Sequence, residues 1–482
     1  MHACISGIGV VPFSRIHWSV RVDRQRALVV ALPITHTFQE VALKNKFLSA
    51  AVVAVLAMAT TSLVFAGGYQ VNEHNARAMG MGGAFVAIAS DASAVFFNPA
   101  GLAFQKGFSV LGGGTFIMPS SSFTSIKQNG TGTRPDASMK SQTFFPPNLY
   151  LAYNMDNLTL GLGVFAPYGL GTEWDSKWDG RFSAVKTDLQ ALYINPSVGY
   201  RIDDQWSVGA GISYVTGTAK LNRKIRTFSS LGPPPSLATT DGDITLDGSG
   251  SGFTFNVGVL YKASDKLSAG LAYRHVTKVK YEGDAKFTNM QALASFFPGG
   301  TGSVELPMPT NIQAGVAYKI TDEFIMAADL QFVQWDAYDK LTIVLPNGPA
   351  PTGLAAAIVG PNPLQTTQVQ VKNWKNSMIY RVGGEYRMEK LALRAGFLYD
   401  GTPQISPSVE PLLPDANRIE FTLGAGYMVS EMVSVDLAYQ FISASDRKGS
   451  FVDLLGTTPV ASYAGTYKTT ANLFGVSIGL HF

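Results

Sequence analysis

The feature that most constrains this chain is the pattern of residues 108–482, where short segments of alternating apolar and polar residues are separated by turn-forming residues. No run of 18 apolar residues occurs in this part, so a membrane-spanning helix is not expected there. Period-2 alternation is typical of β-strands with two different faces. Fourteen candidate strands follow, near residues 108–118, 146–154, 157–166, 187–201, 205–221, 250–263, 266–280, 304–320, 323–335, 375–387, 390–400, 418–428, 432–443 and 469–482.

The connections between these candidate strands alternate in length. Long polar loops alternate with short turns, which fall at 154–157, 203–204, 263–265, 321–322, 388–389 and 429–431. An even number of strands, with short turns at one end and long loops at the other, is typical of bacterial outer-membrane barrels. The sequence therefore predicts an all-β fold, a 14-stranded antiparallel transmembrane β-barrel in the cell outer membrane of a Gram-negative-type bacterium.

The two faces of the candidate strands differ in a way that favours a membrane barrel over a soluble sandwich. Residues 433–441 alternate between apolar and polar side chains, which either fold could produce. In the three preceding candidate strands, however, charges such as Arg394 and Glu420 share one face, opposite aromatic side chains such as Tyr399 and Phe421. This arrangement suits an apolar outer band and a polar lumen. We interpret these charges as a structural network in the lumen rather than as a substrate site.

The N-terminal part of the chain predicts processing before folding. Residues 43–66 combine Lys44 and Lys46, an apolar stretch and the A-x-A-like end Val64-Phe65-Ala66, which is the pattern of a secretory signal peptide. The alternative, a transmembrane anchor, needs a longer apolar run. Residues 1–42 are interpreted as an upstream extension from a misplaced start. Residues 67–107, rich in Gly and Ala, would then begin the mature protein.

Composition excludes several classes of site. The only cysteine is Cys4, upstream of the expected cleavage point, so disulfides, thiolate metal sites and cysteine nucleophiles are not expected. The chain carries 37 Lys and Arg against 34 Asp and Glu, a near balance that gives no reason to expect a nucleic-acid partner. No metal, cofactor or catalytic residue is predicted, since no nucleophile elbow or complete dinucleotide fingerprint occurs.

Several motifs resemble one known family. The end of the chain alternates apolar residues up to Phe482, which resembles the signal read by the barrel-assembly machinery. An ordered set of segments resembles the FadL-type outer-membrane transporters of long-chain fatty acids and hydrocarbons (FadL/TodX-like). These segments are Gln70-Val71-Asn72-Glu73, Asn98-Pro99-Ala100-Gly101, Ala166-Pro167-Tyr168-Gly169-Leu170, Trp178-Asp179-Gly180-Arg181-Phe182, Ile194-Asn195-Pro196-Ser197, Trp335-Asp336-Ala337-Tyr338, Tyr399-Asp400-Gly401-Thr402-Pro403 and Leu413-Pro414-Asp415-Ala416-Asn417-Arg418.

The resemblance implies a barrel plugged by residues 67–107 as a hatch, with ligands that enter from outside and leave sideways into the membrane. The hatch and gate residues it implies are Gly67, Gly68, Tyr69, Asn98, Pro99 and Ala100. Expected partners are hydrophobic small molecules, outer-membrane lipid and lipopolysaccharide, and the barrel-assembly machinery through Phe482. A general porin and an outer-membrane lipid hydrolase are the alternative functions; uptake of aromatic or alkane hydrocarbons is the alternative substrate range.

The end of the third candidate strand is a candidate site for sideways exit. Pro167 lacks the backbone N–H that a strand ladder needs, and Gly169 adds backbone freedom, so pairing should fail locally. Pro167 could equally do no more than end the strand at its loop. The resemblance favours a kink with a lateral opening, formed by Ala166, Pro167, Tyr168 and Gly169.

A second candidate site is Ala219-Lys220-Leu221-Asn222-Arg223. It resembles the family segment whose final Arg faces the lumen and holds a ligand's anionic head group, so Arg223 and Lys220 are the expected ligand-binding residues. A cation in an apolar pocket suits a carboxylate through charge-assisted hydrogen bonds. Arg223 could instead lie in solvent at the loop. The family's second cation aligns with Thr342, a departure that favours a less charged ligand.

Overall fold

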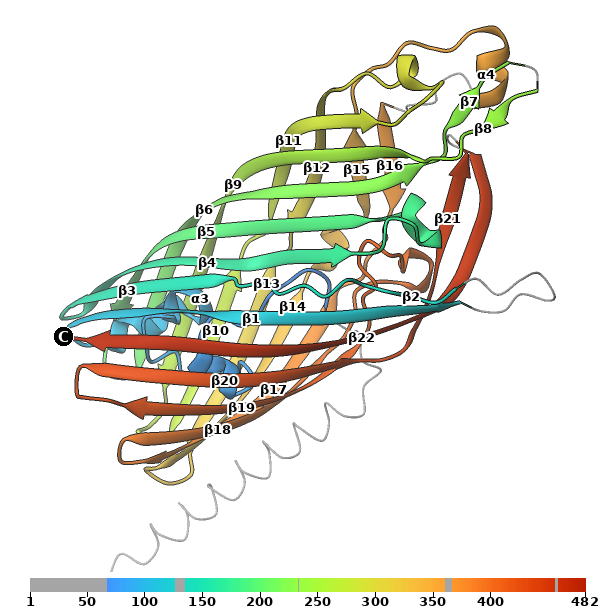
Figure 1. The fold of residues 1–482 in the computed structure, drawn as a ribbon. Helices are drawn as coiled ribbons and strands as arrows, with labels where there is room; N and C mark the ends of the chain where they lie inside the picture. The colour runs from blue at the N-terminus through green and yellow to red at the C-terminus, as the bar shows by residue number, and fades with distance from the viewer. Residues whose placement is uncertain (1–66, 126–134, 233, 360–365, 456–457) are drawn as a thin grey trace, which may run out of the picture. The chain divides into compact units, whose positions relative to one another are not determined.

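The computed structural model of the protein describes residues 67–125, 135–232, 234–359, 366–455 and 458–482. The expected upstream extension 1–42 and signal peptide 43–66 lie outside these residues. In the described part, fourteen antiparallel wall strands form a closed barrel (Figure 1). The predicted all-β barrel and its strand number are confirmed.

The wall strands follow one another around the ring, and each pairs with its neighbours in sequence. The first six are β1 (Phe108–Ser125), β3 (Pro147–Met155), β4 (Leu158–Glu173), β5 (Lys186–Arg201), β6 (Trp206–Ile225) and β9 (Gly242–Lys262). Five later ones are each broken once, and they are β10 with β11 (Leu267–Arg274 and Thr277–Thr288), β12 with β13 (Gly300–Met308 and Asn311–Lys319), β14 with β15 (Phe324–Val333 and Lys340–Val344), β16 with β17 (Thr367–Val371 and Ser377–Met388), and β20 with β21 (Val433–Ala444 and Arg447–Leu455).

Three unbroken strands complete the ring, namely β18 (Leu391–Asp400), β19 (Arg418–Met428) and β22 (Thr458–His481). The ring closes because β22 pairs with β1 over the register Ser109↔His481 to Ser125↔Gly465. The smaller elements of the described residues are β2 (Ala137–Ser138), β7 (Phe228–Ser230), β8 (Ser236–Leu237), α2 (Ala76–Gly80), α3 (Ala94–Phe97), α4 (Gly353–Val359), η1 (Pro99–Phe104), η2 (Asp179–Phe182), η3 (Ala294–Phe296), η4 (Trp335–Ala337) and η5 (Ser406–Ser408). Within the described residues, no helix is both long and apolar enough to cross a lipid bilayer.

The side chains of the wall sort by polarity as the alternation predicts. On β20, Leu437 is 55% exposed whereas its neighbour Asp436 is 7% exposed. On β19, Phe421 and Leu423 point outward while Glu420 is buried. A soluble barrel would show the reverse order, so the apolar side chains form the lipid-facing surface.

Residues 67–107 hydrogen-bond to inward-facing side chains on wall strands all around the ring. Asn256 on β9 donates to Val95 O, and Ser207 on β6 donates to Ala100 O. The other such bonds join Phe85 and Val86 N–H to Asp329, Gly82 N–H to Thr422, Ala76 N–H to Ser477, and Gln440 to Glu73. The segment is therefore anchored inside the barrel, as the hatch prediction requires.

An ion-pair network completes this anchor. Arg77 of α2 lies 2.9 Å from the carboxylate of Glu385, which is fully buried and also pairs with Arg394 at 2.6 Å. Arg394 in turn lies 2.7 Å from Asp436. A buried charge is tolerated when it is paired and hydrogen-bonded. The lumen charges thus hold the hatch, which agrees with their interpretation as a structural network.

Candidate functional site

The pairing of β4 changes at Pro167. On the β5 side, Phe165 pairs with Tyr193 and Tyr168 with Ala191, so β4 advances three residues where β5 advances two. On the β3 side, the ladder ends at Leu149↔Val164. The extra residue is a β-bulge, which bends the strand and leaves ladder groups unpaired. The strand continues to Glu173, so Pro167 does not simply end it.

We call the break in hydrogen bonding between residues 141–146 and residues 166–171 of β4 the pairing gap. Along β4, the gap begins after the Leu149↔Val164 pair. It ends at Glu173, where Lys140 N–H donates to Glu173 O at 2.7 Å. The side chains of Lys140 and Glu173 add an ion pair at 2.9 Å. Residues 141–146 remain attached to β1 on their other side through the Ile117↔Phe144 bridge.

The start of the hatch occupies the free edge of β4 at the pairing gap. Val71 N–H donates to Pro167 O at 2.9 Å, and Gly169 N–H donates to Tyr69 O at 3.0 Å. Gln70 and Tyr168 form an isolated antiparallel bridge between these bonds. The hatch therefore takes hydrogen bonds that a neighbouring wall strand would otherwise make.

Two further close contacts involve glycines, one at the pairing gap and one at the start of the hatch. The ring of Phe144 lies so close to Gly171 that a Cβ at position 171 would come within 1.9 Å of it. Gly68 has a φ of +75° and its N–H donates to Asp415 Oδ2 at 3.1 Å. A Cβ on Gly68 would lie 2.7 Å from the Trp374 ring, so the backbone conformation and the close packing both require glycine there.

The motif Asn98-Pro99-Ala100 fixes the far end of the hatch. Asn98 Oδ1 accepts from Ala100 N–H and caps η1, while Asn98 Nδ2 donates to Val86 O and to Val259 O on β9, both at 3.0 Å. A Cβ on the inward-facing Gly258 would come within 2.0 Å of Asn98 Oδ1. The wall thus lacks a side chain where the motif packs against it.

His74 of the hatch lies directly beneath the bulge. Its ring centroid is 3.9 Å from that of Phe96 and 5.6 Å from that of Phe165, and Nε2 lies 2.9 Å from Val71 O. Burial, together with the nearby charge of Arg274, lowers the pKa of His74 from its usual value to about 3. The neutral imidazole is therefore the form that fits the folded hatch.

The pKa of His74 predicts that acid loosens the hatch. The stabilisation from neutral His74 is complete above the ordinary pKa of about 6.5 and is lost as pH falls from there toward the folded-state value. Between neutral pH and about pH 4.5, the protection of hatch amides should fall roughly a hundredfold more than it does in His74→Gln over the same range. The variant keeps a donor for Val71 O but does not titrate. An equal loss of protection in both proteins would contradict the assignment.

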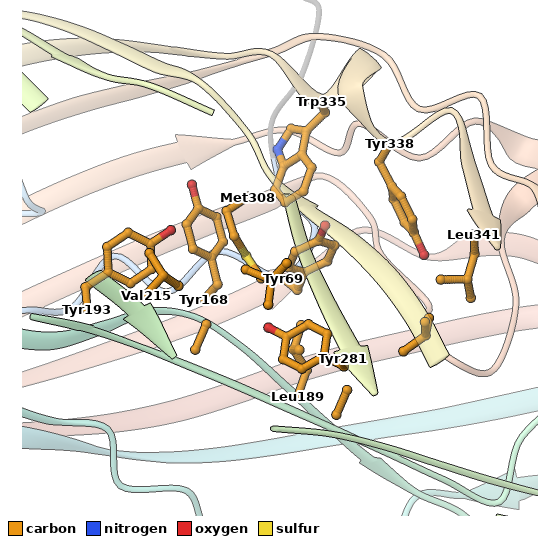
Figure 2. Close-up of a cluster of buried hydrophobic side chains, with 14 of the residues drawn as sticks. Tyr69, Tyr168, Leu189, Tyr193, Val215, Tyr281, Met308, Trp335, Tyr338 and Leu341 are labelled. Atoms are coloured by element: carbon orange, nitrogen blue, oxygen red, sulfur yellow. The ribbon is translucent and has the colours of Figure 1, made fainter. Parts of the chain in front are cut away.

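An apolar cavity lies next to the pairing gap at Leu170, with about 570 Å³ of empty space that is partly open to solvent. Tyr69, Leu170, Leu189, Tyr338 and Trp374 supply much of its wall. Figure 2 shows a cluster of buried hydrophobic side chains around Tyr69, in which Tyr69 lies between Trp335 and Tyr281. The ring centroids of Tyr69 and Trp335 are 4.8 Å apart. Such a cavity suits a hydrophobic ligand.

A second cavity lies beside the bulge itself, with about 390 Å³ of empty space that is partly open to solvent. Gln70, Phe96, Pro167, Tyr168 and Arg274 contribute to its lining. The first cavity contains Tyr69 and Leu170, so neighbouring residues of the hatch and of β4 line both spaces. The kink residues predicted from the sequence therefore lie between two cavities.

The two expected ligand-binding residues lie in different environments. Arg223 belongs to the inward-facing set of β6 with Ser207 and Ser213, and its Nη2 donates to Gln368 at 2.8 Å. Lys220 lies on the opposite face, where Nζ is 2.7 Å from Asp247 Oδ2 and about half of each side chain is exposed. The structure therefore corrects the pairing of Lys220 with Arg223, because residues an odd number of positions apart on a strand point to opposite faces.

Sequence reasoning missed two charged residues of the cavity, Lys372 and Glu410, which form an ion pair. Lys372 lies in the break between β16 and β17, and Glu410 lies in the connection between β18 and β19, where no periodicity indicates which way a side chain points. Trp374, a large aromatic residue in the same break as Lys372, is the signal that could have marked it as part of an internal site.

Comparisons with known proteins agree with this geometry. Residues 56–482 match the family model "Outer membrane protein transport protein (OMPP1/FadL/TodX)". A "Long-chain fatty acid transport protein" of Escherichia coli O6:H1 is 26% identical over 468 residues, which cover 91% of this chain and 99% of the relative.

Two solved structures share the fold. A FadL homologue from Pseudomonas aeruginosa has a TM-score of 0.74 and 20% identity, covering 86% of this chain and 100% of that one. The toluene transporter TodX of Pseudomonas putida has a TM-score of 0.65 and 18% identity, covering 86% and 99%. The family match spans most of the chain, so this protein belongs to the OMPP1/FadL/TodX family of outer-membrane transport proteins.

Proposed function

We propose that this protein carries hydrophobic small molecules, long-chain fatty acids or hydrocarbons, across the outer membrane and releases them sideways through the pairing gap. The observation that carries the proposal is the break in hydrogen bonding beside Pro167, next to two cavities that are lined by the neighbouring hatch residues Gln70 and Tyr69. A hydrophobic ligand gains nothing by entering a watery periplasm when hydrocarbon lies beside the barrel wall. The names of the relatives, a fatty acid transport protein and a toluene transporter, support this class of cargo.

The proposed route begins in the apolar cavity. A ligand would contact Tyr69 and Leu170 there, pass the Tyr69–Val71 segment, and leave between β4 and residues 141–146. The segment Tyr69–Val71 holds the edge of β4 by only two backbone hydrogen bonds. Each such bond contributes on the order of 1 kcal/mol net, so small shifts of the hatch would suffice to free this edge.

The same features disfavour the alternative functions. A general porin needs an open water-filled lumen, whereas the hatch here bonds to wall strands around the ring. A hydrolase needs a serine paired with a histidine, and two of the three described histidines, His74 and His275, contact backbone, aromatic or tyrosine groups instead. We therefore propose a transporter without catalytic residues, with outer-membrane lipid, lipopolysaccharide and, through Phe482, the barrel-assembly machinery as partners.

Arg223 provides a test of ligand capture in this route. The variant Arg223→Ala should weaken binding of a fatty acid by roughly ten- to a hundredfold, because a hydrogen bond to a charged group contributes about 1.5 to 3 kcal/mol. Binding of an uncharged hydrocarbon, measured by calorimetry on the detergent-solubilised protein, should barely change. Lys220→Ala is the matched control, since Lys220 points away from the lumen. A similar loss for both ligands in Arg223→Ala would reject the head-group role.

A further inference from the structure

The apolar cavity holds an ion pair that the proposed route does not use, in which Lys372 is buried and about a quarter of the Glu410 side chain is exposed. Lys372 follows β16 and is 4% exposed, and its Nζ contacts the carboxylate of Glu410 and donates to Gln370 Oε1 at 3.0 Å. Both residues line the cavity together with Tyr338 and Trp374. A charge is expensive to bury in an apolar site, so an ion pair retained there calls for an explanation.

Glu410 reaches this cavity from a connection rather than from the wall. Residues 401–417 join β18 to β19, and their backbone is held by Thr172 and Trp174, which donate to Leu412 O and Pro411 O. Gln404 donates to Leu413 O at 3.0 Å. These bonds place the carboxylate of Glu410 inside the lumen while its backbone remains part of the loop.

The charges around Glu410 are unequal. Its carboxylate contacts Lys372 and also acts electrostatically on Arg223, the next inward residue of β6 after Leu221, which itself lines the cavity. Asp188, the other acid of the lining, belongs to the outward-facing set of β5, where it lies opposite Lys220. Lys372 is therefore the cation in contact with the Glu410 carboxylate, and Arg223 lies within its electrostatic reach.

We propose that Glu410 occupies the position of a ligand's head group, as a tethered carboxylate that the carboxylate of an incoming amphiphile displaces from Lys372. This inference rests on the proposed function and adds a specificity-determining pair to it. The carboxylate of such a ligand matches the cation Lys372. Its alkyl chain matches the apolar cavity and the aromatic wall of that cavity. An uncharged ligand has no group to exchange, and it binds with the ion pair intact.

The exchange gives Glu410 a defined effect on selectivity. A tethered group competes with free ligand at a high effective concentration, so it lowers the apparent affinity for acids only. The same loop contacts the gate, because Asp415 accepts from Gly68 N–H. Release of Glu410 would therefore loosen residues 408–413 close to the start of the hatch.

The test compares decanoate with decanol on the detergent-solubilised full-length protein, using tryptophan fluorescence to follow binding. In Glu410→Gln, decanoate should bind roughly tenfold or more tightly than in the wild type, since the competitor is removed. Decanol should change less than twofold. The double variant Lys372→Gln with Glu410→Gln removes the cation that the freed carboxylate site would offer, and it should lose the gain for decanoate. Heat-modifiable migration on a gel shows that each variant is folded.

Hydrogen exchange supplies a second readout. Decanoate should speed exchange of residues 408–413 in the wild type, whereas decanol should not. Unchanged decanoate affinity in Glu410→Gln, or a parallel change for both ligands, would overturn the inference while leaving the proposed function standing. If neither ligand bound to the wild type or any variant, the proposed function would fall, and this inference with it.

Discussion

Deletion of Pro167 is expected to reduce uptake of a radiolabelled fatty acid or toluene to the background of cells that lack the protein. Between Phe165 and Tyr168, β4 contains one residue more than β5 opposes. Removing Pro167 restores the count, and Tyr168 then keeps its inward direction because one residue still separates it from Phe165. A regular β4 can pair with its neighbour and close the gap. Binding by the purified protein should remain.

The matched control is Pro167→Ala, which restores a backbone N–H but keeps the extra residue. The bulge and the uptake should therefore both persist, because the neighbouring chain is adapted to the bend. Full uptake through the deletion variant, once a regular β4 had been verified by structure determination, would show that the ligand leaves by another route.

Deletion of residues 67–106 should convert the barrel into an open channel. These residues lie inside the barrel, and glycines on the inner wall leave space for their backbone: a Cβ on Gly383 would lie 2.0 Å from Met81 O. Without the hatch, that space fills with water. Planar-bilayer recordings should show a large, steady conductance that the intact protein lacks.

Glu385→Gln is the control for damage to the lumen network. It weakens the contact to Arg77 but leaves the hatch in place, so it should not raise the conductance to the level of the deletion. A deletion variant that inserts, migrates as a folded barrel and still stays closed would refute the plug.

The strands could be predicted because membrane barrels impose a strict period. Lipid requires apolar side chains on one face of each strand, and the backbone N–H and C=O groups must hydrogen-bond to neighbouring strands. Pro167 has no N–H to donate, so it is conspicuous in an otherwise regular segment. The prediction was wrong, however, about where a wall strand is interrupted. It treated 304–320 as one strand, whereas the wall strand breaks at Pro309 and Thr310 between β12 and β13.

The candidate site was predicted only in part, because it depends on which distant residues meet. Arg223 was expected to face the lumen because its segment resembles that of the family, and the parity of a strand would have placed Lys220 on the opposite face. Lys372 and Glu410 lie 38 positions apart, one in the break between β16 and β17 and the other in the connection between β18 and β19, where no period applies. Likewise, nothing in the local sequence showed that Val71 and Tyr69 would bond to the edge of β4.

The most direct measurement of sideways exit closes the pairing gap reversibly. Cysteines at Phe144 and Gly171, which face each other across the gap, can be joined by a short bis-thiosulfonate reagent that a reductant cleaves. Uptake of a radiolabelled hydrophobic ligand by cells is then measured before joining, after joining and after reduction, with each single-cysteine variant treated in parallel. The account predicts that uptake falls to background when the gap is joined and returns on reduction. Unchanged uptake through a fully joined protein would contradict it.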